Sequence, residues 1–116
     1  MTRPNILFLL IDCLRADAIL GQRGGAQTPT LDRLVRSGTA FTQAVSSASS
    51  TTPCVASLLT GAYSFVHGIR SIFGLKLNPS VPSLVESFRE QGYHTYAEVS
   101  GPLFPETSLD RGFDAY

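Results

Sequence analysis

Asn5-Ile-Leu-Phe-Leu-Leu-Ile11, followed directly by Asp12, is the stretch that decides the fold. The apolar run is bounded by Pro4 and Asp12, as is typical of a strand buried on both faces of a parallel sheet. It is far shorter than the ~20 residues that span a bilayer, and no small-residue cleavage site of a secretory signal follows it. We therefore expect a first, central strand, no membrane segment and, by default, a cytoplasmic location.

Length and composition limit the possible classes of protein. The 116 residues, 43% of them hydrophobic, suffice for one modest core but not for two typical domains. Nine Lys and Arg balance nine Asp and Glu, so the net charge does not favour nucleic acid or an anionic membrane as a partner. Cys13 and Cys54 form no C-x-x-C pair, so we expect buried free thiols rather than a zinc ribbon or a disulfide framework.

Three segments have the sequence pattern of short helices, namely residues 28–38, 53–61 and 82–92. Each has a proline in its first turn, apolar residues on one face and a glycine as its end. The second helix would begin at Thr51 or Thr52, so the hydroxyl-rich residues 46–52 open onto a helix N-terminus.

Strand patterns alternate with these helices. After the strand at 5–11, a weak strand pattern occupies residues 40–44, residues 93–99 form a further predicted strand, and residues 101–116 read as a surface loop. This order predicts an α/β fold, a partial parallel or mixed sheet flanked by helices. In such folds the loops at the carboxyl ends of the strands are functional.

Asp12 stands at one such strand end, and it forms a D-x-x-R-x-D pattern with Arg15 and Asp17. A rigid strand that ends in a carboxylate suits a hard divalent cation, because loops can supply the other oxygen ligands. The same residue can equally cap the following turn or helix. The local sequence leaves both interpretations open.

Thr51 is the candidate nucleophile. A hydroxyl at a helix N-terminus meets free N–H groups and the positive end of the helix dipole, which stabilise an alkoxide and a bound oxyanion. It would need a base or a metal for activation, such as a cation on Asp12. The alternative is an ordinary Thr cap.

The remaining candidates are less specific. His67 lies in a predicted loop near Thr51 and could reach an anion, whereas His94 precedes a strand and looks structural. Arg70 and Lys76 either contact an anionic substrate or are simply solvated.

Four motifs in order resemble the opening of a domain of the sulfatase family, in the alkaline phosphatase superfamily. They are Asn5-Ile-Leu-Phe-Leu-Leu-Ile-Asp-Cys-Leu-Arg-Ala-Asp17, Thr28-Pro-Thr-Leu-Asp-Arg-Leu34, Thr51-Thr-Pro-Cys-Val-Ala-Ser-Leu-Leu-Thr-Gly61 and Gly112-Phe-Asp114. The resemblance implies an alkaline-phosphatase-like α/β architecture. It also implies that residues 1–116 are the N-terminal portion of one catalytic domain, whose C-terminal half, with further metal ligands, is absent.

The resemblance implies roles for individual residues. Asp12 corresponds to the first metal-binding Asp of the family, and Cys13 stands where the second would be. Thr51 occupies the position of the Cys or Ser that becomes formylglycine, and threonine cannot undergo this conversion. Val55 occupies the position of the motif Arg. Relatives such as nucleotide pyrophosphatases, phosphoethanolamine transferases and lipoteichoic acid synthases use an unmodified Thr on the metal. The family's Lys and His motif would fall at residues 98–102, where neither residue occurs.

We therefore expect a metal-dependent hydrolase or transferase of small-molecule sulfuric or phosphoric esters. Thr51 would attack, Asp12 and Thr51 would bind Ca²⁺, Mn²⁺, Zn²⁺ or Mg²⁺, and the 116 residues alone would be inactive. Candidate contacts to the oxyanion are Thr52, Arg15 and His67. A non-catalytic, sulfatase-like module that binds an anion or a partner is the alternative. A phosphotransferase with Asp12 as nucleophile ranks last, because its D-x-D pattern would need an Asp in place of Leu14.

Overall fold

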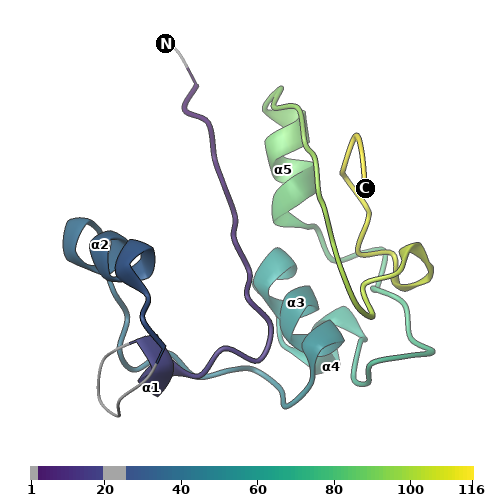
Figure 1. Cartoon of the computed structure of the whole chain (residues 1–116). Coiled ribbons are helices and arrows are strands. Elements are labelled where there is room, and N and C mark those ends of the chain that lie inside the picture. The colour runs from purple at the N-terminus through teal and green to yellow at the C-terminus, as the bar shows by residue number, and fades with distance from the viewer. Residues whose placement is uncertain (1–2, 20–25) are drawn as a thin grey trace. The chain divides into compact units, whose positions relative to one another are not determined.

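The computed structural model describes residues 3–19 and 26–116, and the chain divides into two compact units, residues 1–44 and 45–116. The first unit contains α1 (Ala16–Ile19) and α2 (Pro29–Ser37). The second contains α3 (Thr51–Thr60), α4 (Ser64–His67), α5 (Leu84–Glu90) and the 3-10 helix η1 (Pro105–Thr107) (Figure 1). The three predicted helices are confirmed as α2, α3 and α5. Within the described ranges, no helix has the length and apolar character that crossing a membrane requires.

The predicted strands are not found in the described part of the chain. Residues 5–11 form neither helix nor strand (Figure 1), and the side chains from Ile6 to Ile11 are 44–87% exposed. The prediction of a buried central strand is therefore not met, and the sheet is not confirmed. A strand is buried only when neighbours pair with both of its edges and other layers cover its faces. In residues 3–19 and 26–116 the β pairing is one isolated parallel bridge, between Tyr96 and Ala115.

Helix α2 begins and ends as its sequence predicts. Pro29 occupies its first turn, and the N–H of Gly38 donates to the carbonyl of Leu34 at 2.9 Å. Thr28 precedes the helix, and its hydroxyl donates to the Asp32 carboxylate at 3.1 Å but accepts no capping hydrogen bond from a backbone N–H. No residue of α2 is buried, and Leu34 is 55% exposed. The helix therefore forms from local sequence signals rather than from core packing.

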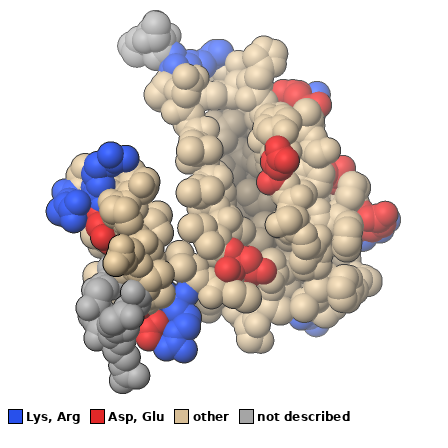
Figure 2. Space-filling view, in the orientation of Figure 1, with Lys and Arg blue, Asp and Glu red and all other residues tan. Residues whose placement is uncertain are grey.

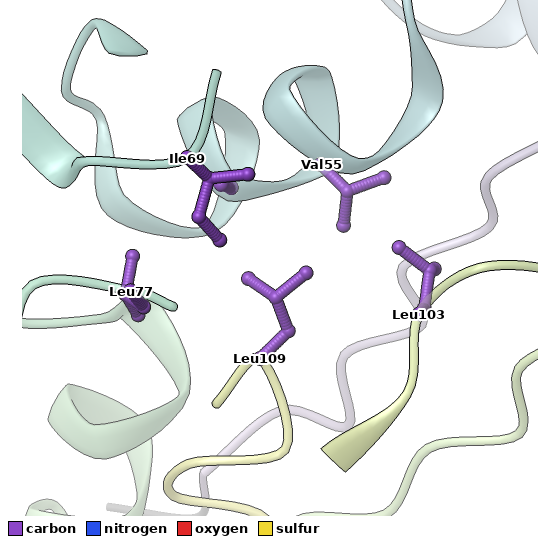
Figure 3. Close-up of a cluster of buried hydrophobic side chains, with 6 residues drawn as sticks. Val55, Ile69, Leu77, Leu103 and Leu109 are labelled. Atoms are coloured by element: carbon purple, nitrogen blue, oxygen red, sulfur yellow. The ribbon is translucent and has the colours of Figure 1, made fainter. Parts of the chain in front are cut away.

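The hydrophobic core lies in the second unit, where α3 contacts both α4 and α5. Figure 3 shows its side chains pointing toward one another, with Leu109 among the others. Leu103 and Leu109 come from the segment that the sequence analysis assigned to a surface loop, so that prediction is wrong in part. The two leucines lie six residues apart in a mostly irregular segment and follow no helix or strand period, which hides their role from pattern analysis. The core residues are Val55, Ala56, Ile69, Leu77, Leu103 and Leu109.

The N-terminus of α5 is joined to the C-terminal segment. Ser83 and Glu86 form a capping box: the Ser83 hydroxyl accepts from the Glu86 N–H at 3.1 Å, and the Glu86 carboxylate accepts from the Ser83 N–H at 2.9 Å. Arg111 pairs with the same carboxylate at 2.9 Å, and its guanidinium also donates to the carbonyl of Val81. One carboxylate therefore both caps the helix and holds the C-terminal segment.

The Gly112-Phe-Asp114 motif makes further contacts between the C-terminal segment and the α5 region. Gly112 has φ +94°, and a Cβ there would lie 2.7 Å from the backbone nitrogen of Glu86. The Thr95 hydroxyl donates to the Gly112 carbonyl at 2.8 Å, and the Asp114 carboxylate accepts from the Thr95 N–H at 2.9 Å. These contacts, together with an Arg89–Asp114 ion pair at 3.1 Å, fasten the motif to the α5 region.

Charged side chains of both signs are dispersed over the face shown in Figure 2, with uncharged surface between them. The two cysteines are free thiols, as predicted. Cys13 is exposed and Cys54 only partly buried, so the expectation that both are buried is wrong.

Candidate functional site

Thr51 is the first residue of α3, where the sequence analysis places it. Ser50 precedes it in extended backbone (φ −139°, ψ 155°), and the Cys54 N–H donates to the Ser50 carbonyl at 3.3 Å. At the other end, Gly61 adopts φ 65° and its N–H donates to the Ser57 carbonyl at 2.8 Å. Thr51 is half-buried, and no side-chain hydrogen bond from Ser50 caps the helix. The structure thus places a hydroxyl at the positive end of a ten-residue helix.

The serine-rich residues before α3 fold back onto its first turn. The Ser46 hydroxyl donates to the Ala48 carbonyl at 2.8 Å, and the Cys54 thiol donates to the same carbonyl at 3.0 Å. Ser46 Oγ also lies 3.0 Å from Cys54 Sγ. The run is thus a loop held by polar contacts, one of the two possibilities for such a composition.

Thr52 connects the start of α3 to two distant loops. Its side chain is fully buried, and its hydroxyl lies 3.0 Å from the Ile72 carbonyl and 3.4 Å from the Pro102 carbonyl, each of which it can donate to. Because a hydroxyl has one proton, these carbonyls share a single donor. A contact between Thr52 and a substrate oxyanion stays a prediction, and in this structure the hydroxyl holds loops together.

Asp12 lies in the first unit, on an exposed turn. Its carboxylate accepts from the Cys13 N–H at 2.9 Å, and Cys13 has φ 56°, an unusual conformation for a residue other than glycine. Arg15 donates two hydrogen bonds to Asp17, at 2.6 and 2.9 Å. These bonds lower the pKa of Asp17 and raise that of Arg15. Contact of Arg15 with a substrate stays a prediction that requires this exposed pair to open.

His67 is the last residue of α4 and is fully buried. The Ile69 N–H donates to its Nδ1 at 3.1 Å, so the neutral ring carries its proton on Nε2, which donates to the Ser57 hydroxyl at 3.0 Å. In this tautomer His67 does not accept the Ser57 proton, so the pair is not an activated Ser–His dyad. The predicted contact with an anion would require the ring to leave this position.

The pH dependence of stability tests this arrangement. Burial lowers the pKa of His67 below its usual value of 6.5, so the unfolded chain binds the proton more readily. The contribution of the neutral His67 ring to the free energy of unfolding is complete above pH ~6.5. This contribution is lost as the pH falls below that value, at up to about 1.4 kcal/mol per pH unit. Urea unfolding between pH 7.5 and 5 should show this slope in the natural chain and in His94→Gln, which changes an exposed histidine. It should be absent in His67→Gln, and an unchanged slope there would refute the assignment.

The oxygen donors fit a hard divalent cation in type but not in number. A carboxylate at Asp12 and a hydroxyl at Thr51 are suitable ligands, yet such a cation takes about six. Across residues 3–19 and 26–116, no three His, Cys, Asp or Glu side chains gather as a metal site.

Val55, which the family resemblance predicts to stand at the position of the motif Arg, is 6% exposed. It points from α3 into the core, toward Leu103 and Leu109 (Figure 3). No charged side chain at this position therefore faces the start of the helix.

A cavity close to Thr52 escaped the sequence analysis. It has a volume of about 290 Å³ and lies between the loop at residues 72–76 and the segment 104–107, which includes η1. The two segments are far apart in sequence and carry no motif, so only Lys76, named as a possible anion contact, indicated the cavity in advance. The lining residues are Ile72, Phe73, Gly74, Leu75, Lys76, Phe104, Glu106 and Thr107.

Comparison with known proteins confirms the resemblance to the sulfatase family. The family model described as Sulfatase matches residues 4–116. An ulvan-active sulfatase of Formosa agariphila is 40% identical over 96 residues, which cover 81% of this chain and 18% of that protein. An arylsulfatase of Clostridium perfringens is 31% identical over 110 residues, 92% of this chain and 22% of that protein.

A third relative, a multifunctional alkaline phosphatase superfamily protein of Trinickia caryophylli, is 41% identical over 73 residues, 58% of this chain and 14% of its own length. No solved structure matches the chain significantly. The chain thus spans less than a quarter of the length of these relatives. With a family match across nearly every residue, the chain belongs to the sulfatase family.

Proposed function

We propose that this chain supplies the nucleophile region of a metal-dependent hydrolase of sulfuric or phosphoric esters, with Thr51 as the attacking residue. The position of Thr51 as the first residue of α3 is the observation that carries the proposal. The N–H groups of the first helical turn and the helix dipole stabilise negative charge that develops on the ester oxygens. The relatives named as sulfatases support the sulfate ester, and the alkaline phosphatase superfamily relative supports the phosphate ester.

Sulfatase-family proteins generally use a divalent metal ion, and we assign its first ligands to Asp12 and Thr51. When bound, such an ion neutralises charge on the nucleophile and on the ester. Because these two donors leave most of its coordination unfilled, the 116-residue chain alone should be inactive.

The test is hydrolysis of 4-nitrophenyl sulfate, 4-nitrophenyl phosphate and a phosphodiester by the full reading frame that contains this chain, with and without Mn²⁺, Zn²⁺, Ca²⁺ or Mg²⁺. Thr51→Val keeps the side-chain shape but removes the hydroxyl, and should lower kcat/KM at least about 1,000-fold. Thr51→Ser keeps the hydroxyl and should retain measurable turnover. Equal activity of Thr51→Val and the natural protein would refute the mechanism.

A second candidate is a non-catalytic module that binds an anion or a partner, and the burial of Val55 at the motif position favours it. This function predicts that the full protein binds inorganic sulfate or phosphate but has no turnover with any of the metals. Metal-dependent turnover that requires the Thr51 hydroxyl would exclude it.

A further inference from the structure

Thr52 lies on the buried face of α3, next in sequence to the candidate nucleophile. Thr52, Val55 and Ala56 are all buried, and their spacing of three and four residues places them on one face of the helix. Figure 3 shows Val55 of this face pointing into the core. Successive side chains of an α-helix are rotated by about 100°, so the half-buried Thr51 lies beside this face. The rotation of the first turn about the helix axis therefore sets the direction of the Thr51 hydroxyl.

The Thr52 hydroxyl makes a directional contact that fixes this rotation. It lies 3.0 Å from the Ile72 carbonyl and 3.4 Å from the Pro102 carbonyl, which are 20 and 50 residues away along the chain. A hydrogen bond weakens steeply as its angle departs from linearity, whereas the apolar contacts of Val55 have no preferred direction. No side-chain hydrogen bond from the N-cap residue holds the first turn. The orientation of this turn relative to the core therefore depends on Thr52.

The Cys54 thiol, also in the first turn, does not replace this anchor. It donates to the Ala48 carbonyl, six residues earlier, so it holds the turn only to the loop that directly precedes it. The two carbonyls that Thr52 reaches belong instead to segments that come after α3 in the chain. Thr52 thus orients the first turn against parts of the chain that are distant in sequence.

We infer that Thr52 is a positioning residue for Thr51, and that its hydroxyl aims the nucleophile by fixing the rotation of the first turn of α3. The inference rests on the proposed function of Thr51 and adds a residue that acts through it. Because Thr52 is fully buried, it contacts no substrate in this arrangement. Loss of the hydroxyl leaves two carbonyls without this donor, so the turn and the two segments shift. A misplacement of about 1 Å can lower a rate about 100-fold, so even a small shift is measurable.

Turnover of 4-nitrophenyl sulfate and 4-nitrophenyl phosphate by the full reading frame, with the activating metal present, tests the inference. Thr52→Val keeps the side-chain shape but removes the hydroxyl. It should lower kcat about 10–100-fold and leave KM within about twofold, because attack rather than binding is misdirected. Thr52→Ser keeps the hydroxyl and should restore most of the natural kcat. An unchanged kcat in Thr52→Val would overturn the inference.

Thr107→Val is the matched control. Thr107 is also buried, but its hydroxyl donates to the Phe104 carbonyl at 2.7 Å, within the C-terminal segment. The substitution removes a buried hydroxyl in the same way, yet it should leave kcat and KM unchanged. Equal losses of kcat in Thr107→Val and Thr52→Val would show a general effect of lost stability and would overturn the inference.

A double substitution separates positioning from direct contact with the substrate. In the Thr51→Val background, adding Thr52→Val should leave the residual turnover unchanged, because Thr52 acts only through the Thr51 hydroxyl. A further loss of turnover in the double variant would show that Thr52 acts on the substrate itself, and would overturn the positioning role.

Amide hydrogen exchange separates this inference from the proposed function. Residues 54–57 are the ones to follow, since their N–H groups bond to carbonyls at the start of α3. Thr52→Val should speed their exchange at least about fivefold in the full protein, and Thr52→Ser and Thr107→Val should not. Natural turnover in Thr51→Val would refute the proposed function, while faster exchange in Thr52→Val would still show that Thr52 anchors the turn. Unchanged exchange in Thr52→Val together with Thr51-dependent turnover would refute the positioning role alone.

Discussion

Replacing Gly112 with alanine should destabilise the second unit by about 2–5 kcal/mol, the sum of a left-handed conformation and a steric clash. Gly112 has φ +94°, where an L-residue is strained. An added Cβ would also lie 2.7 Å from the Glu86 nitrogen and 3.1 Å from its Cα, and neither backbone atom can turn aside as a flexible side chain can. The clash would push the C-terminal segment away from the capping box of α5.

Gly74→Ala is the matched control for this prediction. Gly74 also has positive φ (+78°), but nothing lies within 4 Å of a Cβ built there. It should therefore cost only about 1–2 kcal/mol, the conformational part. Urea unfolding of both variants measures the difference, and equal losses would show that the close approach of Gly112 to Glu86 does not contribute to stability.

Leu109→Ala should cost about 2–5 kcal/mol of unfolding free energy, the range for a large-to-small change in a packed core. Leu109 is 2% exposed and lies among Val55, Ile69 and Leu103 (Figure 3). Its removal leaves a void bordered by α3 and the C-terminal segment, which the surrounding backbone fills only in part.

Leu58→Ala makes the same chemical change on the exposed side of α3, where the leucine is 50% exposed. It should alter stability by no more than about 0.5 kcal/mol. A loss below about 1 kcal/mol for Leu109→Ala would contradict the assignment of this residue to the core.

Local signals explain why the helices could be predicted from the sequence. Proline in the first turn and glycine at the end place α2 and α3 within a residue or two, because both residues act through their own backbone geometry. The strands depend on partners far away in sequence, and residues 5–11 have none among the described residues that bury them. The buried leucines of the C-terminal segment follow no period, so no pattern distinguishes them from loop residues.

The features of the candidate site also differ in whether the sequence alone could predict them. The position of Thr51 follows from the helix pattern, and its presence at the start of α3 is confirmed. The burial of His67 and the cross-links made by Thr52 depend on which loops meet in three dimensions, which the sequence does not express. The roles of Asp12 and Thr51 as metal ligands stay predictions.

The Thr52 contacts also constrain how this region forms during synthesis. Fifty residues separate Thr52 from Pro102, one of the carbonyls within reach of its hydroxyl. At roughly 5–20 residues per second, the ribosome takes about 3–10 s to add them. During that interval α3 lacks its full set of tertiary contacts, and a ten-residue helix is only marginally stable in water by itself. The helix that carries Thr51 therefore becomes fixed late in vectorial synthesis, after the segment with Leu103 and Leu109 has left the exit tunnel.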